Sequence, residues 1–305
     1  MSDHLSYQEL LERSHSVNWR VDDLIGGERR LDFSRPFLPE TFARTEDLAF
    51  LSPDEKLKLN HIRAREYLAL FELLERAIVP FVSGQAAEKL DEDPYRAPAL
   101  RQFVREENKH RELFRRFLKE FDEGFGGDCE LIGPADDIAR AFLAHSPLAV
   151  TIAVLGLEWM SQGHYVGSVE GNEALDPQFK NLLKHHWAEE AQHAELDRLM
   201  LRALAADCDP EAINRAVDEY FEIGAFFDAG FAQQAELDLA AFERAARRVL
   251  DADQRAQFVR SQHRALCWTF LGTAMSNANF LAALDDLGAP IRSRVEAAAG
   301  AFVLH

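Results

Sequence analysis

The sequence predicts an all-α protein built from long helices. Four residue pairs in which an N-cap residue precedes proline mark helix starts, at Ser52-Pro53, Ser146-Pro147, Asp176-Pro177 and Asp209-Pro210. No segment shows the alternation of apolar and polar residues that is typical of a half-buried strand. An apolar content of 47% with 22 Phe is ample for a packed core. We therefore expect a bundle of long helices.

Each expected helix is delimited by its own start and stop signals. Ser52-Pro53-Asp54-Glu55 combines an N-cap, a proline and a capping-box glutamate, and Pro80 should end that helix at Val79. The second should end in the glycine-rich run at 123–127. The expected helices cover residues 52–79, 98–121, 134–145, 146–169, 176–206 and 209 onward, the last with a break near 236–239.

The chain is expected to form a single domain over residues 1–305. Residues 1–51 have turn chemistry and a short helical piece near 7–13, so they should form a strap over the main body. Residues 52–206 should form a four-helix bundle. Residues 209–305 should add further helices, with a turn at Gly288-Ala289-Pro290.

Composition limits the partners of the chain. The formal net charge is −18 and no basic run occurs, which disfavours nucleic acid and anionic membranes. The longest apolar run, 147–157, is too short to span a bilayer. Cys129, Cys208 and Cys267 are widely spaced, as is typical of free thiols in a reducing compartment. With no signal-peptide pattern, we expect a soluble cytoplasmic protein; its oligomeric state is left open, a homodimer included.

The strongest functional signal lies in the stretch Lys184–His193. Glu190 and His193 are three residues apart, and His186 precedes Glu190 by four, so all three share one face of the predicted helix. Leu183 and Ala194 lie on the same face, which indicates that it points inward. Because an unpaired buried charge costs several kcal/mol, a metal ion would explain this set.

A second copy of the pattern occurs earlier in the chain. Glu107 and His110 form another Glu-x-x-His pair on a face shared with Phe103 and Phe114. Glu158 is the one acid within the apolar run 149–160, and it precedes Glu190 by 32 residues. These residues are the candidate metal ligands of the second, third and fourth long helices.

The first long helix offers two candidates. Glu75 shares a face with Phe71 and Ile78 and precedes Glu107 by 32 residues, which favours it as the ligand. Glu72 also suits an antiparallel helix pair and remains the alternative. The role of His186 stays open: it could be a third histidine ligand, a hydrogen-bond donor to a ligand, or a core histidine. His263 is expected to be a core histidine with its hydrogen bonds satisfied.

These motifs resemble the di-iron and di-manganese carboxylate proteins of the ferritin-like kind, in which two helices each supply a Glu and two others each supply a Glu-x-x-His pair. The resemblance covers about residues 53–206. The segment Glu106-Glu107-Asn108-Lys109-His110 is also similar to the motif of soluble acyl-carrier desaturases. His186, with Glu190 and His193, resembles the p-aminobenzoate N-oxygenase family, in which an extra histidine on the last ligand helix binds the metal.

One position departs from another member of this group. In the ribonucleotide reductase small subunit a tyrosine follows the second-helix glutamate by two turns, and here that position is Phe114. The resemblance implies a ferritin-like four-helix bundle that holds two iron ions, with manganese as an option. The resemblance implies six catalytic residues that are also metal ligands: Glu75, Glu107, His110, Glu158, Glu190 and His193. His186 is the seventh expected metal ligand.

The implied function is that of an oxygen-activating di-iron oxidase or oxygenase. It would use dioxygen, a small organic substrate and an electron donor, and N-oxygenation of an amine is its most specific form. The alternatives are a desaturase-like oxidase of an acyl chain, a ferroxidase or iron-storage protein, a di-manganese protein, and a buried polar network without metal. The chain after Asp209 exceeds what a storage cage needs, which argues against storage.

Overall fold

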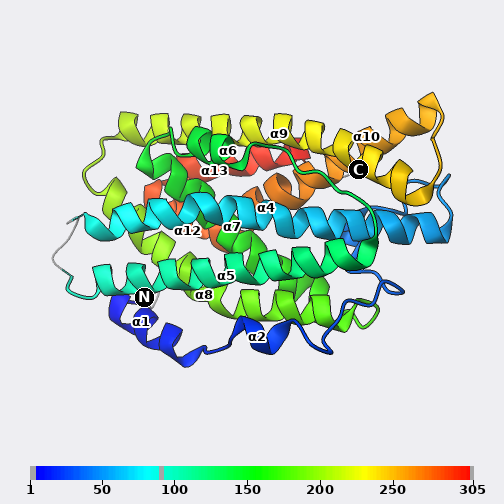
Figure 1. Cartoon of the computed structure of the whole chain (residues 1–305). Coiled ribbons are helices and arrows are strands. Elements are labelled where there is room, and N and C mark those ends of the chain that lie inside the picture. Colours follow the sequence, from blue (N-terminus) through cyan, green and yellow to red (C-terminus); the bar gives the residue numbers. More distant parts are fainter. Residues whose placement is uncertain (1–4, 89–92, 303–305) are drawn as a thin grey trace.

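The computed structural model describes residues 5–88 and 93–302, and it confirms the all-α class (Figure 1). These residues contain helices and no strand. Four of the long helices begin at the predicted caps, because Ser52, Ser146, Asp176 and Asp209 each accept a hydrogen bond from a first-turn N–H. The long helices are α4 (Pro53–Ala87), α5 (Arg96–Phe125), α7 (Pro147–His164), α8 (Pro177–Ala205) and α9 (Pro210–Ala246).

Four of these helices form the bundle that the sequence predicts. α4 packs along α5 and α7 along α8, and the two pairs meet where α5 contacts α8 (Figure 1). α5 turns one face inward, with Phe103, Glu107, His110 and Phe114 buried. α7 is buried on nearly all sides, because α8 and α9 both pack against it. The midpoints of the four helices therefore face a common interior.

The N-terminal residues lie across the outside of the bundle. α1 (Tyr7–Ser16) and α2 (Val21–Leu24) contact both α5 and α8, and α3 (Glu40–Ala43) contacts α4. The buried side chain of Asn60 on α4 accepts hydrogen bonds from the N–H groups of Phe37 and Leu38. These contacts hold the segment as a strap over three of the four bundle helices, α4, α5 and α8.

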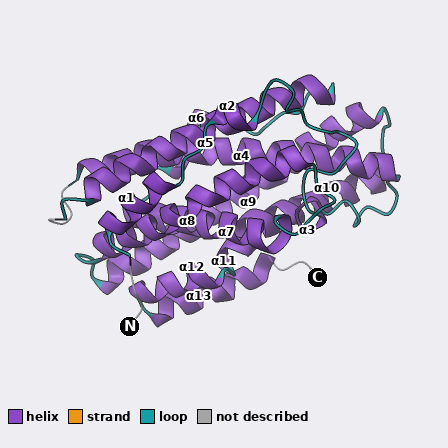
Figure 2. Cartoon of the chain, turned by 90° about the horizontal axis from the view of Figure 1, so that it is seen from below, coloured by secondary structure: helices purple, strands orange, loops and turns teal. Residues whose placement is uncertain are grey.

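The C-terminal helices cover the opposite side. α9 packs on α4 and α7, and α10 (Ala252–Cys267) packs on α9. The turn before α12 continues the cover, because the side chain of its N-cap residue, Asn277, donates a hydrogen bond to the carbonyl of Trp159 on α7. The remaining segments are α6 (Ala135–Phe142), the π-helical turns η1 (Tyr165–Val169) and η2 (Trp268–Gly272), α11 (Thr273–Met275), α12 (Ala278–Leu284), the 3₁₀ turns η3 (Asp285–Leu287) and η4 (Gly300–Phe302), and α13 (Ala289–Ala299) (Figure 2).

Two predicted helix boundaries are wrong. α4 continues through Pro80 to Ala87, because Pro80 is exposed while Ile78 and Val82 on either side are buried in the core. α9 does not break near 236–239, because Leu239 packs in one core cluster with residues of α4 and α10.

Among the described residues, no single helix has the length and apolar composition of a membrane span. α6 and the segment Pro147–Val169 meet that test only together, across a bend of 117°.

The cap of α8 should matter more than an ordinary cap, because it also anchors the strap. Buried Asp176 accepts from the N–H of Phe179 at 2.6 Å and from the N–H of Asp32 at 3.1 Å. Asp176→Ala should lower the free energy of unfolding by about 2 kcal/mol, the upper part of the range for a cap. Urea unfolding measures this, with Asp209→Ala as the control, since Asp209 caps only α9. Equal losses in the two variants would contradict the anchoring role.

Candidate metal centre

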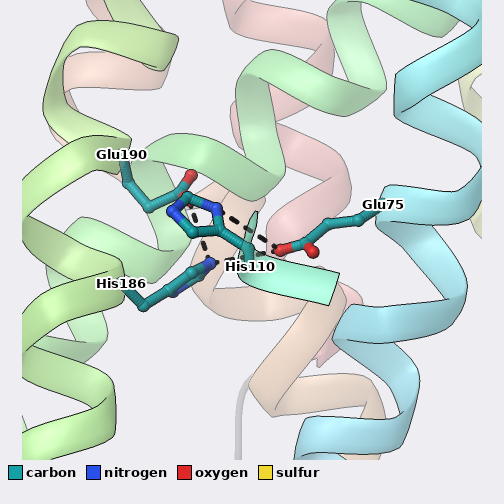
Figure 3. A group of neighbouring side chains, drawn as sticks. All are labelled: Glu75, His110, His186 and Glu190. Carbon is teal, nitrogen blue, oxygen red and sulfur yellow. Dashed lines mark hydrogen bonds and ion pairs between the residues drawn. The ribbon is translucent and has the colours of Figure 1, made fainter. Parts of the chain in front are cut away.

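Carboxylates and imidazoles from three bundle helices converge in the buried interior. One set consists of Glu75 on α4, His110 on α5, and His186 and Glu190 on α8 (Figure 3). A second set consists of Glu107, His110, Glu190 and His193. Within each set the donor atoms lie within 4.8 Å of one another, and all six residues are buried.

The first set is centred on Glu190 Oε1. This oxygen lies 2.9 Å from His110 Nδ1 and 2.9 Å from His186 Nε2. Glu75 Oε1 lies 3.3 Å from His186 Nε2 and 3.8 Å from His110 Nδ1. The predicted helical spacing of His186 and Glu190 thus places both on the cluster, together with a carboxylate from α4.

The second set lies one helical turn further along. His193 Nδ1 lies 2.8 Å from Glu107 Oε1 and 3.5 Å from Glu190 Oε2. His110 Nδ1 lies 3.8 Å from the same oxygen of Glu107. The two oxygens of Glu190 therefore face different sets, which is the arrangement of a carboxylate that bridges two ions.

Apart from His186 Nε2 and Glu75 Oε1, which are hydrogen-bonded at 3.3 Å, the close donor atoms of the two sets are not aligned as hydrogen bonds. Among the described residues, His110 Nδ1, His193 Nδ1, Glu190 Oε1, Glu75 Oε2 and both carboxylate oxygens of Glu107 have no hydrogen-bond partner. Buried polar groups normally have partners, and each orphaned one costs about 1–3 kcal/mol. Donor atoms that converge without bonding to each other fit a shared cation, so these residues suit a pair of metal ions.

The pKa values show how strongly these groups need a compensating charge. The pKa of Glu75 is raised to about 8, mainly by burial and secondly by the negative charge of Glu107. Burial alone would lower the pKa of His186, but Glu190 and Glu75 raise it to about 9. Burial disfavours the charged form of Glu190 as well, which would raise its pKa. The positive charges of His186, His193 and His110 instead hold this pKa well below the usual value. Protons on the imidazoles thus compensate the carboxylates when no metal does.

Glu158 faces the cluster from the fourth helix, α7. Burial raises its pKa well above the usual value, and its hydrogen bond with Glu190 and the charges of Glu190 and Glu107 raise it further. It is not among the donors that lie within 4.8 Å of one another. Its assignment as a ligand therefore stays a prediction that rests on its burial beside Glu190.

The alternative on α4, Glu72, lies outside the cluster. Its Oε1 accepts from both Arg115 Nη2 at 2.6 Å and Arg111 Nη2 at 3.4 Å on α5. Glu75, one turn away, points between α5 and α8 instead (Figure 3). The geometry thus favours Glu75 over Glu72 as the α4 ligand.

Sequence reasoning missed the carboxylates that hold the histidines. Glu189 Oε2 lies 2.9 Å from His110 Nε2, and Glu106 Oε2 lies 3.0 Å from His193 Nε2. An Nε2–H bonded in this way leaves Nδ1 free to bind a metal, which is how outer partners orient metal-binding histidines. Each of these residues directly precedes the glutamate of a Glu-x-x-His pair. That doubled glutamate, present in both copies, is the signal that could have revealed them.

Asp197 is a second unpredicted residue. It lies one turn after His193 on α8, it is fully buried, and neither carboxylate oxygen has a hydrogen-bond partner within the described chain. Burial raises its pKa well above the usual value, against the opposing effect of His193. A buried acid therefore borders the second set, and its spacing of four from His193 places it on the ligand-bearing face.

Aromatic rings and the strap close the cluster from outside. Phe103 stacks on His193 with ring centroids 4.0 Å apart, and Phe114 packs edge-on to His186 at 5.0 Å. From the strap, Trp19 stacks parallel to His110 at 6.0 Å and carries the ammonium of Lys109 over its ring. Lys109 also pairs with Glu189. The strap thus contacts the surroundings of the cluster, which no local sequence pattern indicated.

No protein-family model matches the sequence, and no curated protein matches it. A mutant of R2-like ligand-binding oxidase with an aerobically reconstituted Fe/Fe cofactor is similar over 88% of this chain and 95% of that one, at 17% identity and a TM-score of 0.49. Another mutant, with an anaerobically reconstituted Mn/Fe cofactor, covers the same shares at 15% identity and a TM-score of 0.47. Similarity this distant does not assign a metal or a reaction, which depend on this chain's own residues.

The choice between the two α4 glutamates can be tested by metal content. Glu75→Gln should reduce the iron or manganese bound per chain, because it removes a carboxylate that faces His110 and His186. Glu72→Gln should leave the metal content unchanged, since Glu72 pairs with arginines instead. Plasma emission analysis of both folded variants measures this. The reverse pattern would identify Glu72 as the ligand.

The outer carboxylates should control metal affinity. Glu189→Gln removes the charge that holds His110 and should weaken binding by about 10–100-fold, as is typical of such partners. Competition with a chelator of known affinity measures the change. Glu195→Gln is the control, because Glu195 lies on the same helix but at a partly exposed position. Equal affinity of the Glu189 variant and the wild type would show that Glu189 does not orient the ligand.

Proposed function

We propose that this protein is a dioxygen-activating di-metal oxidase, with iron, or manganese and iron, held by the two overlapping donor sets. The observation that carries the proposal is the pair of buried sets that share His110 and Glu190. Carboxylate oxygens and imidazole nitrogens without thiolate suit iron and manganese. Two such ions, when bound, can supply two electrons together to dioxygen.

The chain's own residues prepare the site for this chemistry. Glu75, Glu107, Glu158 and Glu190 nearly neutralise two divalent ions, so that the pair can be buried at low electrostatic cost. Glu106 and Glu189 orient the two histidines. The aromatic cover excludes water, which strengthens electrostatic interactions within the site. Repeated turnover also requires an electron donor, which we include in the proposal.

The residue at the α5 position does not support a tyrosyl radical there. Phe114 lies against His186, where the ribonucleotide reductase pattern places a tyrosine. The phenol of Tyr67 lies one ring further out: Tyr67 packs on Phe71, and Phe71 packs on His186. We therefore favour direct oxidation of a small organic substrate over storage of a protein radical.

The extra histidine favours N-oxygenation of an amine as the specific reaction. His186 lies 2.9 Å from Glu190 and 3.3 Å from Glu75, so one ion would be bound by two histidines. An acyl-chain oxidase is the second candidate, because the cavity bordered by α4, α6, α7, α9 and η2 is apolar; its volume is only about 20 Å³, so its walls would have to move apart to admit an acyl chain. Its lining is wholly apolar: Leu70, Leu73, Leu74, Ile132, Ile138, Leu157, Phe227, Phe231, Phe270 and Leu271.

The proposed function predicts that protein loaded anaerobically with two ferrous ions consumes dioxygen without taking up further iron. His186→Leu should keep the fold but change the rate of iron oxidation at least tenfold, because it removes one of the three imidazoles. His185→Leu should oxidise iron at the wild-type rate, since the His185 ring lies away from the donor sets and bonds to the carbonyl of Asn181. Stopped-flow absorbance with an oxygen electrode measures both.

Two results would overturn the proposal. Uptake of many ferrous ions per chain into a mineral core would establish iron storage instead. Failure of the folded protein to bind transition metal would leave the cluster as a buried polar network.

A further inference from the structure

A second group of metal-binding side chains lies outside the bundle centre. It comprises Asp228 on α9, and His263 and Cys267 on α10, whose donor atoms lie within 4.8 Å of one another. His263 and Cys267 are four residues apart near the end of α10, so they share one face. The three residues belong to neither donor set of the central cluster.

One carboxylate oxygen is the common neighbour of the other two groups. Asp228 Oδ1 lies 2.8 Å from His263 Nε2 and 2.9 Å from Cys267 Sγ. His263 is therefore hydrogen-bonded, as expected, but its side chain is 30% exposed and not part of the core. Asp228 is 46% exposed, whereas Cys267 is buried. The group thus opens to solvent on one side and has its sulfur on the inner side.

From this geometry we infer that Asp228, His263 and Cys267 form a second metal site, of the kind that binds zinc. Sulfur, imidazole nitrogen and carboxylate oxygen are the donors zinc takes in proteins, at about 2.0–2.3 Å. A thiolate disfavours the hard ions and separates this site from the sulfur-free bundle centre. Three protein ligands leave the fourth tetrahedral position to water on the exposed side.

Binding there exchanges a proton for the metal. Burial and the Asp228 carboxylate raise the pKa of Cys267, so the thiol is protonated in the metal-free protein. A Zn²⁺ ion that bonds to Sγ releases this proton to solvent, with no change in oxidation state. His263 would bind through Nε2, the ring nitrogen that faces Asp228.

The position of the site indicates what it does. Phe227 and Phe231 flank Asp228 on α9, and Phe270 and Leu271 follow Cys267 in η2. These four residues line the apolar cavity. An ion bound to Asp228 and Cys267 joins α9 to the end of α10, and so fixes the two walls of that cavity relative to each other.

Cobalt titration tests this site separately from the central one. A thiolate bound to Co²⁺ gives an intense sulfur-to-metal charge-transfer band in the near ultraviolet, and the carboxylates and imidazoles of the bundle give none. The wild-type protein should develop this band to one equivalent per chain, and added Zn²⁺ should remove it. Absence of the band in folded wild-type protein would show that the three side chains only hydrogen-bond.

Matched variants assign the ligands. Cys267→Ser should abolish the band, and a Cys129→Ser/Cys208→Ser double variant should retain it, because those cysteines lie elsewhere. His263→Gln, at a partly exposed position, should fold normally and weaken cobalt binding at least tenfold. A band that persists in Cys267→Ser, or an unchanged affinity in His263→Gln, would overturn the assignment. Neither result bears on the oxidase proposal, because the band reports only a sulfur ligand.

Discussion

The burial of acids and imidazoles in one helical interior is the constraint on which the structure depends. Each such charge would cost several kcal/mol without compensation. Two divalent ions, as proposed, would balance four carboxylates, and around them Glu189 pairs with Lys109 and Glu106 holds His193. Because the donors lie near the middle of long helices, the packing of those helices fixes their separation. The aromatic rings around them then keep water out.

The cluster has an approximate internal symmetry that two residues break. Each Glu-x-x-His histidine is held by the glutamate that precedes the other pair, His110 by Glu189 and His193 by Glu106. His186 adds an imidazole on the side of Glu75, whereas Asp197 adds a buried acid near His193. The two donor sets are therefore chemically unequal, one richer in nitrogen and the other bordered by a buried acid. Such inequality suits a centre in which substrate and dioxygen approach from one side.

Local signals predicted much of this from the sequence. Caps located the long helices, and helical spacing identified Glu107, His110, Glu190 and His193, since both depend on neighbouring residues. Contacts between distant residues were not predictable: Trp19 reaches His110 from the strap, and the choice of Glu75 depends on arginines of α5 that pair with Glu72. The prediction that the first long helix ends before Pro80 was wrong, because the tertiary packing of Ile78 and Val82 outweighs the local helix-breaking effect of proline.

Anomalous X-ray diffraction from crystals of the iron-loaded protein tests the central claim most directly. The account predicts two iron peaks inside the bundle, one among Glu75, His110, His186 and Glu190, and one among Glu107, Glu190 and His193. Both should lie at about 2.0–2.2 Å from ligand nitrogen and oxygen, the usual length of such bonds. The absence of iron peaks between these side chains in metal-replete crystals, or iron bound only elsewhere on the chain, would contradict it.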